Sequence, residues 1–351
     1  MAPGMTFCTE VVQFTYTLRP VPGQATPFGL RVAAGRIGGM ADACALPDGA
    51  GLGTAPMGGP GWQLDWGPSD PEESVAAVRA AVAAGVGWID TAPFYGWGRA
   101  EEIIGAALDG MTSRPVVLTK CGDVSGPDGR AYDDHRPEVI RADVRASLRR
   151  LRCPVIDVLQ LHDPDPRTPI EESWQTVCDL IGQGTVRAAG LSNHPVQLMD
   201  RARAIGPVAV VQHQYSLLYR APETDGVLAW CAEHAVPFLA WSPLASGFLA
   251  DGFDLAALTT GDLRRRLRWA HPAVVDLAGL RRDLSVIASA AGLSMSALAA
   301  GWVLARGAQP IIGARTPAEA EQIAAFRPIP PDLAAAAQAA ADAAFLAARL
   351  G

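Results

Sequence analysis

The stretch VGWIDTAPFYGWGRAEEIIGAALDGMTSRPVVLTKC, residues 86–121, decides the fold. It begins and ends with short apolar runs, at 86–92 and 115–121, and the segment between them reads as a helix. Short, nearly continuous apolar runs are typical of parallel strands that are buried on both faces. The stretch therefore predicts one strand–helix–strand unit of a parallel sheet.

The same alternation continues along most of the chain. Eight such units favour a closed barrel over an open sheet. We therefore predict an α/β fold, a single-domain (β/α)8 TIM barrel, over residues 50–351. Residues 1–49 have no sustained period and are expected to form a poorly ordered N-terminal extension. The other apolar runs lie at 51–55, 156–162, 186–192, 208–215, 237–242 and 310–314.

Three helices can be placed more closely. Glu72 lies three residues after Ser69, the spacing of a capping box, and predicts that Ser69 caps a helix ending near Gly85. Pro137 stands where the first turn of a helix over 137–152 is expected. The Ala-rich segment 332–350 is interrupted by charged residues, which indicates a surface helix.

Composition excludes several classes of protein. The chain of 351 residues is 49% hydrophobic and 19% charged, so it can form a large core. Its net charge of −7 argues against a nucleic-acid partner, which would need a basic surface. No secretory signal or membrane span is recognisable, and the six cysteines show neither a CxxC pair nor a zinc pattern. We expect reduced thiols, a cytoplasmic protein without a membrane partner, and no metal. The oligomeric state is left open.

Polar residues end several of the predicted strands, where TIM barrels carry their active sites. Asp90, Lys120 and His162 end three strands that are neighbours in the barrel, and Tyr95 follows Asp90 by five residues. A lysine ammonium is expected to lower a tyrosine pKa from its usual value of about 10, so that the phenol can protonate a carbonyl oxygen. Taken singly, each residue is more often structural than catalytic, but the convergence of all four at adjacent strand ends favours catalysis.

These motifs resemble those of the aldo-keto reductase family, over about residues 51–326. The resemblance is to a bacterial branch that acts on sugars, polyols and small aldehydes. It implies NADPH-dependent reduction of an aldehyde, ketone or keto-sugar, with Tyr95 as general acid, Lys120 and Asp90 tuning it, and His162 orienting the carbonyl. The stretches that carry it are GWIDTAPFYGWGRAEEIIGAAL (87–108), VVLTKCG (116–122) and LRRLRCPVIDVLQLHDPD (148–165).

The resemblance also implies a set of cofactor contacts. Ser192, Asn193 and Gln212 match the residues that hold the nicotinamide carboxamide, and Trp241 matches the aromatic that stacks on its ring. The other matched positions are Gly53 and Thr54 on the first strand, Ser242, Leu244 and Gly247 at the pyrophosphate, and Gly313, Ala314, Arg315, Thr316 and Gln322 at the adenosine phosphate.

Two positions depart from the family pattern. Glu319 stands where Gln or Arg is usual, and Ile323 where Asn is usual. A carboxylate beside the 2′-phosphate would repel it, so NADH use is possible, although Arg315 offsets the repulsion. No GxGxxG motif follows a predicted strand, so a Rossmann cofactor site is not indicated.

Two clusters of side chains have competing interpretations. Trp62, Trp66, Phe94 and Trp97 follow the first two strands, where they either line a substrate pocket or pack as ordinary loop aromatics. The arginine-rich run 263–268 is either a solvated helix face or a clamp over the cofactor phosphates.

Two rival functions are weighed against the reductase. A metal-dependent barrel hydrolase would use His162, Asp163, His194 and His213, but His213 alternates with Gln212 and so faces the opposite side of its strand. The other rival is a non-catalytic or weakly catalytic nicotinamide-binding regulatory subunit. The partner of either reductase or regulator is a small carbonyl or sugar, whose identity the sequence leaves open.

Overall fold

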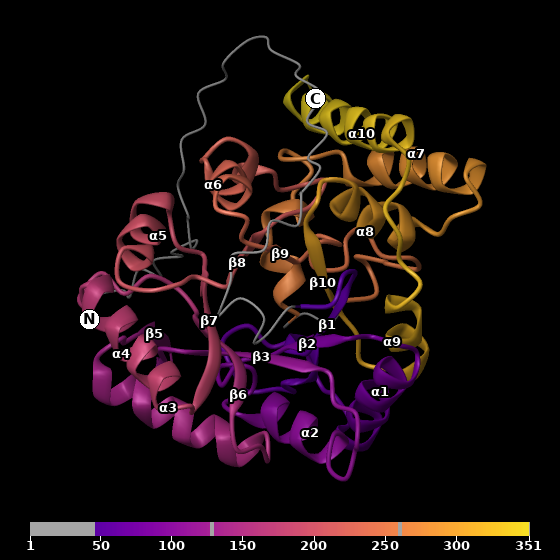
Figure 1. Ribbon diagram of the computed structural model, residues 1–351. Coiled ribbons are helices and arrows are strands. Elements are labelled where there is room, and N and C mark those ends of the chain that lie inside the picture. Colours follow the sequence, from indigo (N-terminus) through magenta and orange to yellow (C-terminus); the bar gives the residue numbers. More distant parts are fainter. Residues whose placement is uncertain (1–45, 127–129, 259–261, 351) are drawn as a thin grey trace, which may run out of the picture.

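The computed structural model describes residues 46–126, 130–258 and 262–350. In this part of the chain, eight parallel strands close into a barrel in the order β1–β10–β9–β8–β7–β6–β3–β2 (Figure 1). The predicted (β/α)8 barrel and all eight predicted strands are confirmed. The strands are β1 (Gly51–Gly53), β2 (Trp88–Asp90), β3 (Val116–Cys121), β6 (Ile156–Leu161), β7 (Val186–Ser192), β8 (Val210–Gln214), β9 (Phe238–Trp241) and β10 (Gln309–Gly313).

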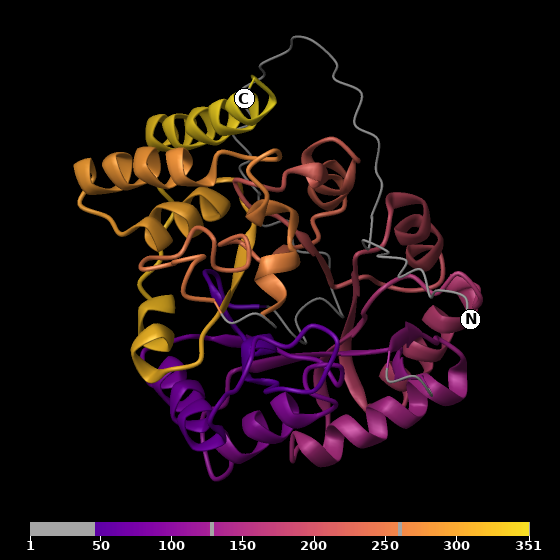
Figure 2. The ribbon, with the colours of Figure 1, turned by 180° about the vertical axis from the view of Figure 1, so that it is seen from behind.

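Helices cover the outside of the barrel, as the ribbon shows from both sides (Figures 1 and 2). The last helix, α10, lies alongside α7 in both views. The helices are α1 (Pro71–Ala83), α2 (Arg99–Ala107), α3 (Pro137–Arg150), α4 (Ile170–Gly182), α5 (Val196–Arg203), α6 (Val227–Glu233), α7 (Leu277–Ala290), α8 (Met295–Ala305), α9 (Pro317–Ile323) and α10 (Pro331–Leu350), with short 3-10 turns at η2 (Ala55–Met57), η3 (Ala221–Glu223), η4 (Leu263–Arg266) and η5 (Arg268–Ala270).

The barrel interior is filled by a layer of large apolar side chains. Trp88 is the largest of these, and it requires glycine on the neighbouring strand: a Cβ at Gly51 would lie 2.3 Å from the Trp88 ring. Such layers are normal for this fold, whose interior is a packed core and not a pore. The layer consists of Trp88, Leu118, Val158, Val210, Leu239 and Ile311.

The character of the interior changes two residues further along the six strands that carry this layer, and at Ser192 of β7, which pairs with Gln212 in register. Because side chains alternate between the two faces of a strand, these residues also face inward. Here the barrel carries polar groups, an indole and glycine instead of aliphatic side chains, so its upper layer is a site and not a core. The layer consists of Asp90, Lys120, Gln160, Ser192, Gln212, Trp241 and Gly313.

Local sequence accounts for most helix starts, with one correction. Pro137 begins α3, as predicted. The predicted capping box at Ser69 is wrong: Asp70 is the N-cap of α1 and accepts from the backbone N–H groups of Glu72 and Glu73. The Ser69 hydroxyl donates instead to the Met57 carbonyl. Aspartate caps a helix as well as serine does, so the spacing alone could not choose between neighbours.

The N-terminal boundary of the barrel can be placed only in part. Leu46 packs against the apolar layer at the floor of the barrel, and Pro47 lies against Gly87. The last residues of the expected extension therefore contact the barrel, whereas 1–45 lie outside the described residues.

The C-terminal segment 332–350 forms the surface helix expected of it. Ala334, Ala337, Ala341 and Ala344 make one buried stripe, and most of the intervening side chains up to residue 347 are exposed or half-buried. Among the described residues, no single helix is long and apolar enough to cross a membrane; α7 and α8 reach that length and composition only together, across an 84° bend.

Candidate active site

Lys120 is the centre of the site at the top of the barrel. Its ammonium is fully buried and donates to Asp90 Oδ1 at 2.6 Å, to the Thr91 carbonyl at 2.9 Å and to the Tyr95 hydroxyl at 3.2 Å. Burial alone would lower the pKa of Lys120, but the negative charge of Asp90 raises it above its ordinary value. The side chain is therefore held as a cation beside the phenol.

Asp90 is fixed from three sides. Besides Lys120, its other oxygen accepts from the Gln212 amide at 2.8 Å and from the Gln160 amide at 3.2 Å. The backbone N–H and the hydroxyl of Thr54 both donate to the Asp90 carbonyl. Gln160 was missed by sequence reasoning, although its position two residues before His162 places it on the same inward face of β6.

Tyr95 lies in the loop after β2, within reach of Lys120. Burial raises the pKa of Tyr95 to about 12, and the charge of Lys120 offsets only part of this rise. The expectation that Lys120 brings this pKa below its usual value is wrong, because the phenol loses more hydration than one neighbouring charge restores. Tyr95 is therefore protonated throughout the physiological range.

His162 joins this group from the end of β6. Its ring lies 6.0 Å from the Tyr95 ring, edge to face. Its Nδ1 lies 2.5 Å from a carboxylate oxygen of Asp123, a residue that the sequence did not single out. Asp123 begins a two-stranded hairpin, β4 (Asp123–Ser125) and β5 (Ala131–Asp133), which also was not predicted.

The hydrolase alternative is not supported by these positions. His194 stacks on His135 and His213 stacks on Phe238, and neither belongs to the group of possible metal ligands around His162 in the described part of the chain. Ligand atoms of Asp123, His162 and Asp163 do lie within 4.8 Å of one another. However, a 2.5 Å separation between two of them is a hydrogen-bond length and leaves no space for an ion between those atoms.

The residues predicted to hold a nicotinamide come together at the ends of three neighbouring strands. Asn193 has a left-handed backbone (φ 59°), and its side-chain oxygen Oδ1 accepts from the Trp241 indole N–H at 2.9 Å. Its amide donates to the Ser192 hydroxyl at 3.2 Å. Gln212 lies deeper, and its amide already donates to Asp90 and to the Gln160 side chain, below the predicted nicotinamide position.

The predicted pyrophosphate loop has an unusual backbone. Ser242, Ala245, Ser246 and Gly247 all have positive φ, and the Ser242 hydroxyl accepts from the Ser246 backbone N–H at 2.7 Å. Leu244 anchors the loop by packing against the two main core clusters. Few side chains adopt this conformation without cost, so the loop is a constrained segment of the kind found at ligand sites.

Within the arginine-rich run 263–268, one arginine fits the interpretation as a phosphate clamp and the others fit a solvated surface. Arg264 is mostly buried, pairs with Asp262 at 2.7 Å and lies over the Trp66 ring at 5.3 Å. It also faces the pyrophosphate loop, because a Cβ added to Gly247 would be 3.6 Å from its guanidinium. The other three arginines of the run, Arg265, Arg266 and Arg268, are exposed.

The residues predicted to hold the adenosine phosphate lie at the start of α9. Thr316 and Glu319 form a capping box, and the Glu319 carboxylate also accepts from the Arg315 backbone N–H at 2.8 Å. The Arg315 side chain reaches the Trp66 carbonyl at 3.4 Å. Ile323, which stands where Asn is usual in the family, is buried in the core. The remaining positions differ in exposure: Ala314 is buried, whereas Gly313 and Gln322 are exposed.

The four loop aromatics do not form one uniform group. Trp62 and Phe94 are buried edge to face at 5.0 Å, and Trp62 also contacts Tyr95. Trp97 packs on Phe94 but is 36% exposed. Trp66 touches this cluster and also meets Arg264 and Arg315, so it lies between the predicted substrate and cofactor positions.

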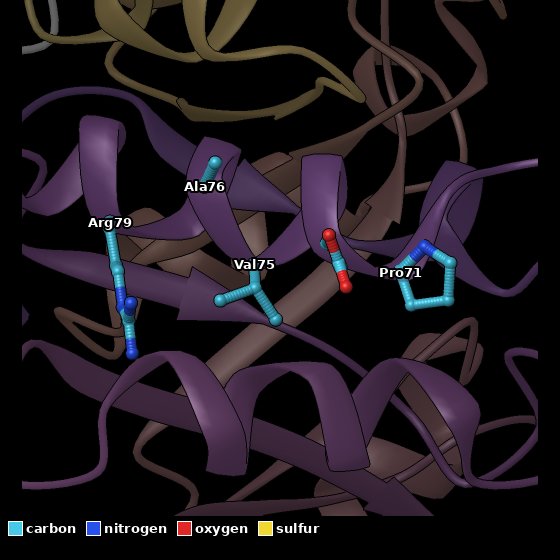
Figure 3. A pocket seen from close by; sticks show the side chains of 5 residues that line it. Pro71, Val75, Ala76 and Arg79 are labelled. Atoms are coloured by element: carbon cyan, nitrogen blue, oxygen red, sulfur yellow. The ribbon is translucent and has the colours of Figure 1, made fainter.

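On the first strand, Gly53 packs closely against β10: a Cβ there would be 2.7 Å from the Ile311 side chain. A separate surface depression lies along the outside of α1, lined by Pro71, Val75, Ala76 and Arg79 together with Glu72 (Figure 3). It is outside the barrel and shares no residue with the strand ends.

Fold and site together define a barrel oxidoreductase that acts on carbonyl or alcohol groups. A model of the aldo/keto reductase family matches residues 51–341. The chain is 31% identical over 280 residues to aldo-keto reductase YhdN of Bacillus subtilis, a match that covers 78% of this chain and 83% of that protein. The chain therefore belongs to the aldo-keto reductase family, as its motifs predicted.

Solved structures agree with this assignment. The glycerol dehydrogenase AKR11B4 of Gluconobacter oxydans is 31% identical, with a TM-score of 0.75 and coverage of 84% of this chain and 91% of that one. An aldo/keto reductase of Klebsiella pneumoniae, solved with NADP and acetate, is 26% identical, with a TM-score of 0.64 and coverage of 84% and 91%.

Proposed function

We propose that this enzyme reduces an aldehyde, ketone or keto-sugar to an alcohol with NADPH, and that Tyr95 is its general acid. The observation that carries the proposal is the 3.2 Å contact of the Tyr95 hydroxyl with a buried Lys120 that Asp90 holds in place. The complexes of the Klebsiella pneumoniae relatives with NADP and with NADPH support the choice of cofactor.

The chemistry of the donor set fits a nicotinamide dinucleotide. Ser192 and Asn193 offer a hydroxyl and an amide for the carboxamide, with Gln212 beneath them and Trp241 for the ring face. The strained loop with Gly247 and Leu244 would hold the pyrophosphate under Arg264, and Arg315 the 2′-phosphate. When bound, the cofactor supplies a hydride to the carbonyl carbon.

Tyr95 then provides the proton. The phenol is protonated before the reaction because its pKa is about 12. As negative charge grows on the substrate's carbonyl oxygen, the O–H bond of Tyr95 breaks and the proton moves to that oxygen. Lys120 stabilises the phenolate that remains, and Asp90 keeps the ammonium in place.

The loop aromatics shape the position of the substrate. Trp62 and Phe94 are buried against the catalytic tyrosine and histidine, where they exclude water from the reacting group. Trp97 presents a partly exposed ring at the rim, and Trp66 connects the rim to the cofactor side. We propose that the substrate carbonyl binds over Tyr95 and His162, with these rings around it.

Replacing Tyr95 with Phe tests the proposal directly. The variant keeps the ring and its packing but loses the proton donor, so we expect turnover to fall by roughly 10²–10⁴-fold. The measurement is NADPH oxidation with a panel of aldehydes, ketones and keto-sugars, together with NADPH binding by tryptophan fluorescence, which should change little.

Tyr132→Phe is the matched control, since Tyr132 is 43% exposed on β5 and should retain activity. Turnover of Tyr95→Phe within a few-fold of the wild-type enzyme would refute the role of Tyr95. A wild-type protein that binds NADPH but reduces no carbonyl would instead support the regulatory alternative.

A further inference from the structure

The hairpin β4–β5 brings a carboxylate to the catalytic histidine. Asp123 Oδ2 lies 2.5 Å from His162 Nδ1, and the two side chains are only 7% and 11% exposed. The hairpin is separate from the barrel sheet, and its first strand begins three residues after Lys120. The sequence motifs gave Asp123 no role, yet within the described residues it is the hydrogen-bond partner of the His162 ring.

We propose that Asp123 is a positioning residue, which holds His162 with Nδ1 protonated and keeps the imidazole cationic at neutral pH. The proposal rests on the proposed carbonyl reduction, because its purpose is to leave Nε2–H as a donor to the substrate oxygen.

The tautomer follows from the contact. A carboxylate only accepts hydrogen bonds, so at this distance the proton between the two groups belongs to Nδ1. A neutral ring would then have a bare Nε2, which repels a carbonyl oxygen. Only the cationic ring has donors on both nitrogens, so the charge of Asp123 determines whether His162 can bind the oxygen.

The charges around His162 favour the cation on balance. Burial alone would lower the pKa of His162, but the charge and hydrogen bond of Asp123 raise it above its ordinary value. Asp163 acts in the same direction and Lys120 opposes it. The groups that face the ring from neighbouring elements are Asp123 on β4, Asp133 on β5, Lys120 on β3, Asp163 and Tyr95 in loops, and the histidines His135 and His194.

A cationic His162 complements Tyr95 in a specific way. The half-buried phenol is a weak acid and gives up its proton late, when the oxygen already carries charge. A fixed N–H donor on a cation stabilises that charge from the beginning. The substrate's carbonyl oxygen therefore receives hydrogen bonds from two donors of different acidity, Tyr95 and His162. Asp123 determines the protonation state of His162.

Nuclear magnetic resonance of the protein labelled with ¹⁵N-histidine tests the charge without requiring turnover. The chain has six histidines, and the His162 signal is identified by its absence in His162→Gln. We expect both ring nitrogens of His162 to be protonated at pH 7 in the wild-type enzyme. In Asp123→Asn, which keeps an oxygen acceptor but no charge, the titration should move to lower pH.

Asp163→Asn is the control, because it removes a nearby carboxylate that is not hydrogen-bonded to the ring. Its effect on the titration should be smaller than that of Asp123→Asn. A neutral His162 at pH 7 in the wild-type enzyme, or equal effects of the two variants, would overturn the proposal. The wild-type titration decides the question even if a variant fails to fold.

Kinetics provide the second readout. Asp123→Asn should reduce kcat/KM roughly ten-fold or more at neutral pH, a part of the 10²–10⁴-fold that a positioned acid or base contributes. Because the cation is the active form, its loss should also move the fall of kcat/KM with rising pH to lower pH. Asp123→Glu, which restores the charge, should recover part of the kcat/KM value and part of its wild-type pH dependence. The proposal would be overturned if Asp123→Glu recovered no activity and Asp123→Asn left the pH profile unchanged. Failure of carbonyl reduction itself would appear in the wild-type enzyme and leave the titration result standing.

Discussion

Two regions of this barrel place a cationic residue near a carboxylate, and they do so in opposite surroundings. At the centre, Lys120 and Asp90 are 2.6 Å apart with side chains 0% and 3% exposed. At the predicted adenosine end, Arg315 and Glu319 lie at the start of a short surface helix, where Glu319 is exposed and Arg315 is half-buried. The carboxylate there binds the backbone N–H of Arg315 and not its guanidinium.

The difference determines how much each charge can do. In the buried pair, water cannot replace a lost partner, so removing one charge leaves the other without compensation. At the surface, water and salt screen the same charges, and typical interactions are about 1 kcal/mol or less. Substitutions at the centre should therefore abolish function, whereas those at the adenosine end should only adjust affinity.

Lys120→Met should give the largest effect. Turnover should fall by roughly 10²–10⁴-fold, because the phenolate of Tyr95 is no longer stabilised. Since Lys120 lowers the pKa of Tyr95 against the larger effect of burial, its removal should move that pKa further above about 12. Steady-state kinetics over a pH series would measure both, and any alkaline limit that Tyr95 sets should move to higher pH.

The same variant should also be less stable. Asp90 would keep only the amides of Gln160 and Gln212, and breaking a buried ion pair typically costs roughly 3–5 kcal/mol. Denaturant unfolding would measure this loss. Full stability together with a normal turnover rate would show that the buried pair is dispensable and would remove the contrast between the two regions.

The contrast also explains what could be predicted from sequence. Inside the barrel, the two-residue period of each strand and the position of strand ends were enough to find Asp90, Lys120 and His162. The same rule would have found Gln160, had it been applied to every inward position. Family motifs then supplied the cofactor positions, whose contacts with the nucleotide remain predictions.

Residues outside the strands followed no such period. Asp123 meets His162 because a hairpin folds back over the strand ends, and the pairing of β4 with β5 depends on contacts that no local pattern specifies. The predicted direction of the Tyr95 pKa shift was wrong for a related reason: the burial of Tyr95 depends on Trp62, which packs on it from the loop after β1. Sequence identified the charged partners but not the degree of desolvation.

Arg315→Ala should have an intermediate effect that separates the two nucleotides. A charge-assisted hydrogen bond contributes roughly 1.5–3 kcal/mol, so NADPH affinity should fall about ten-fold or more. NADH has no 2′-phosphate and should bind almost as before. Titration of both nucleotides by tryptophan fluorescence would measure this, and an equal loss for NADH would place Arg315 elsewhere on the cofactor.

Glu319→Gln should give the smallest change, and in the opposite direction. The carboxylate now accepts from the backbone N–H groups of Arg315 and Thr316, which are donors that a 2′-phosphate could use. An amide has one acceptor oxygen and no charge, so it removes a repulsion of about 1 kcal/mol and competes less for these donors. NADPH should bind up to about five-fold more tightly, less so at high salt, and the affinity for NADH should not change.

Glu321→Gln is the control, because Glu321 is an exposed acid on the same helix, and it should change the affinity for neither nucleotide. Weaker binding of NADPH to Glu319→Gln would mean that the capping box shapes the phosphate site more than its charge opposes it.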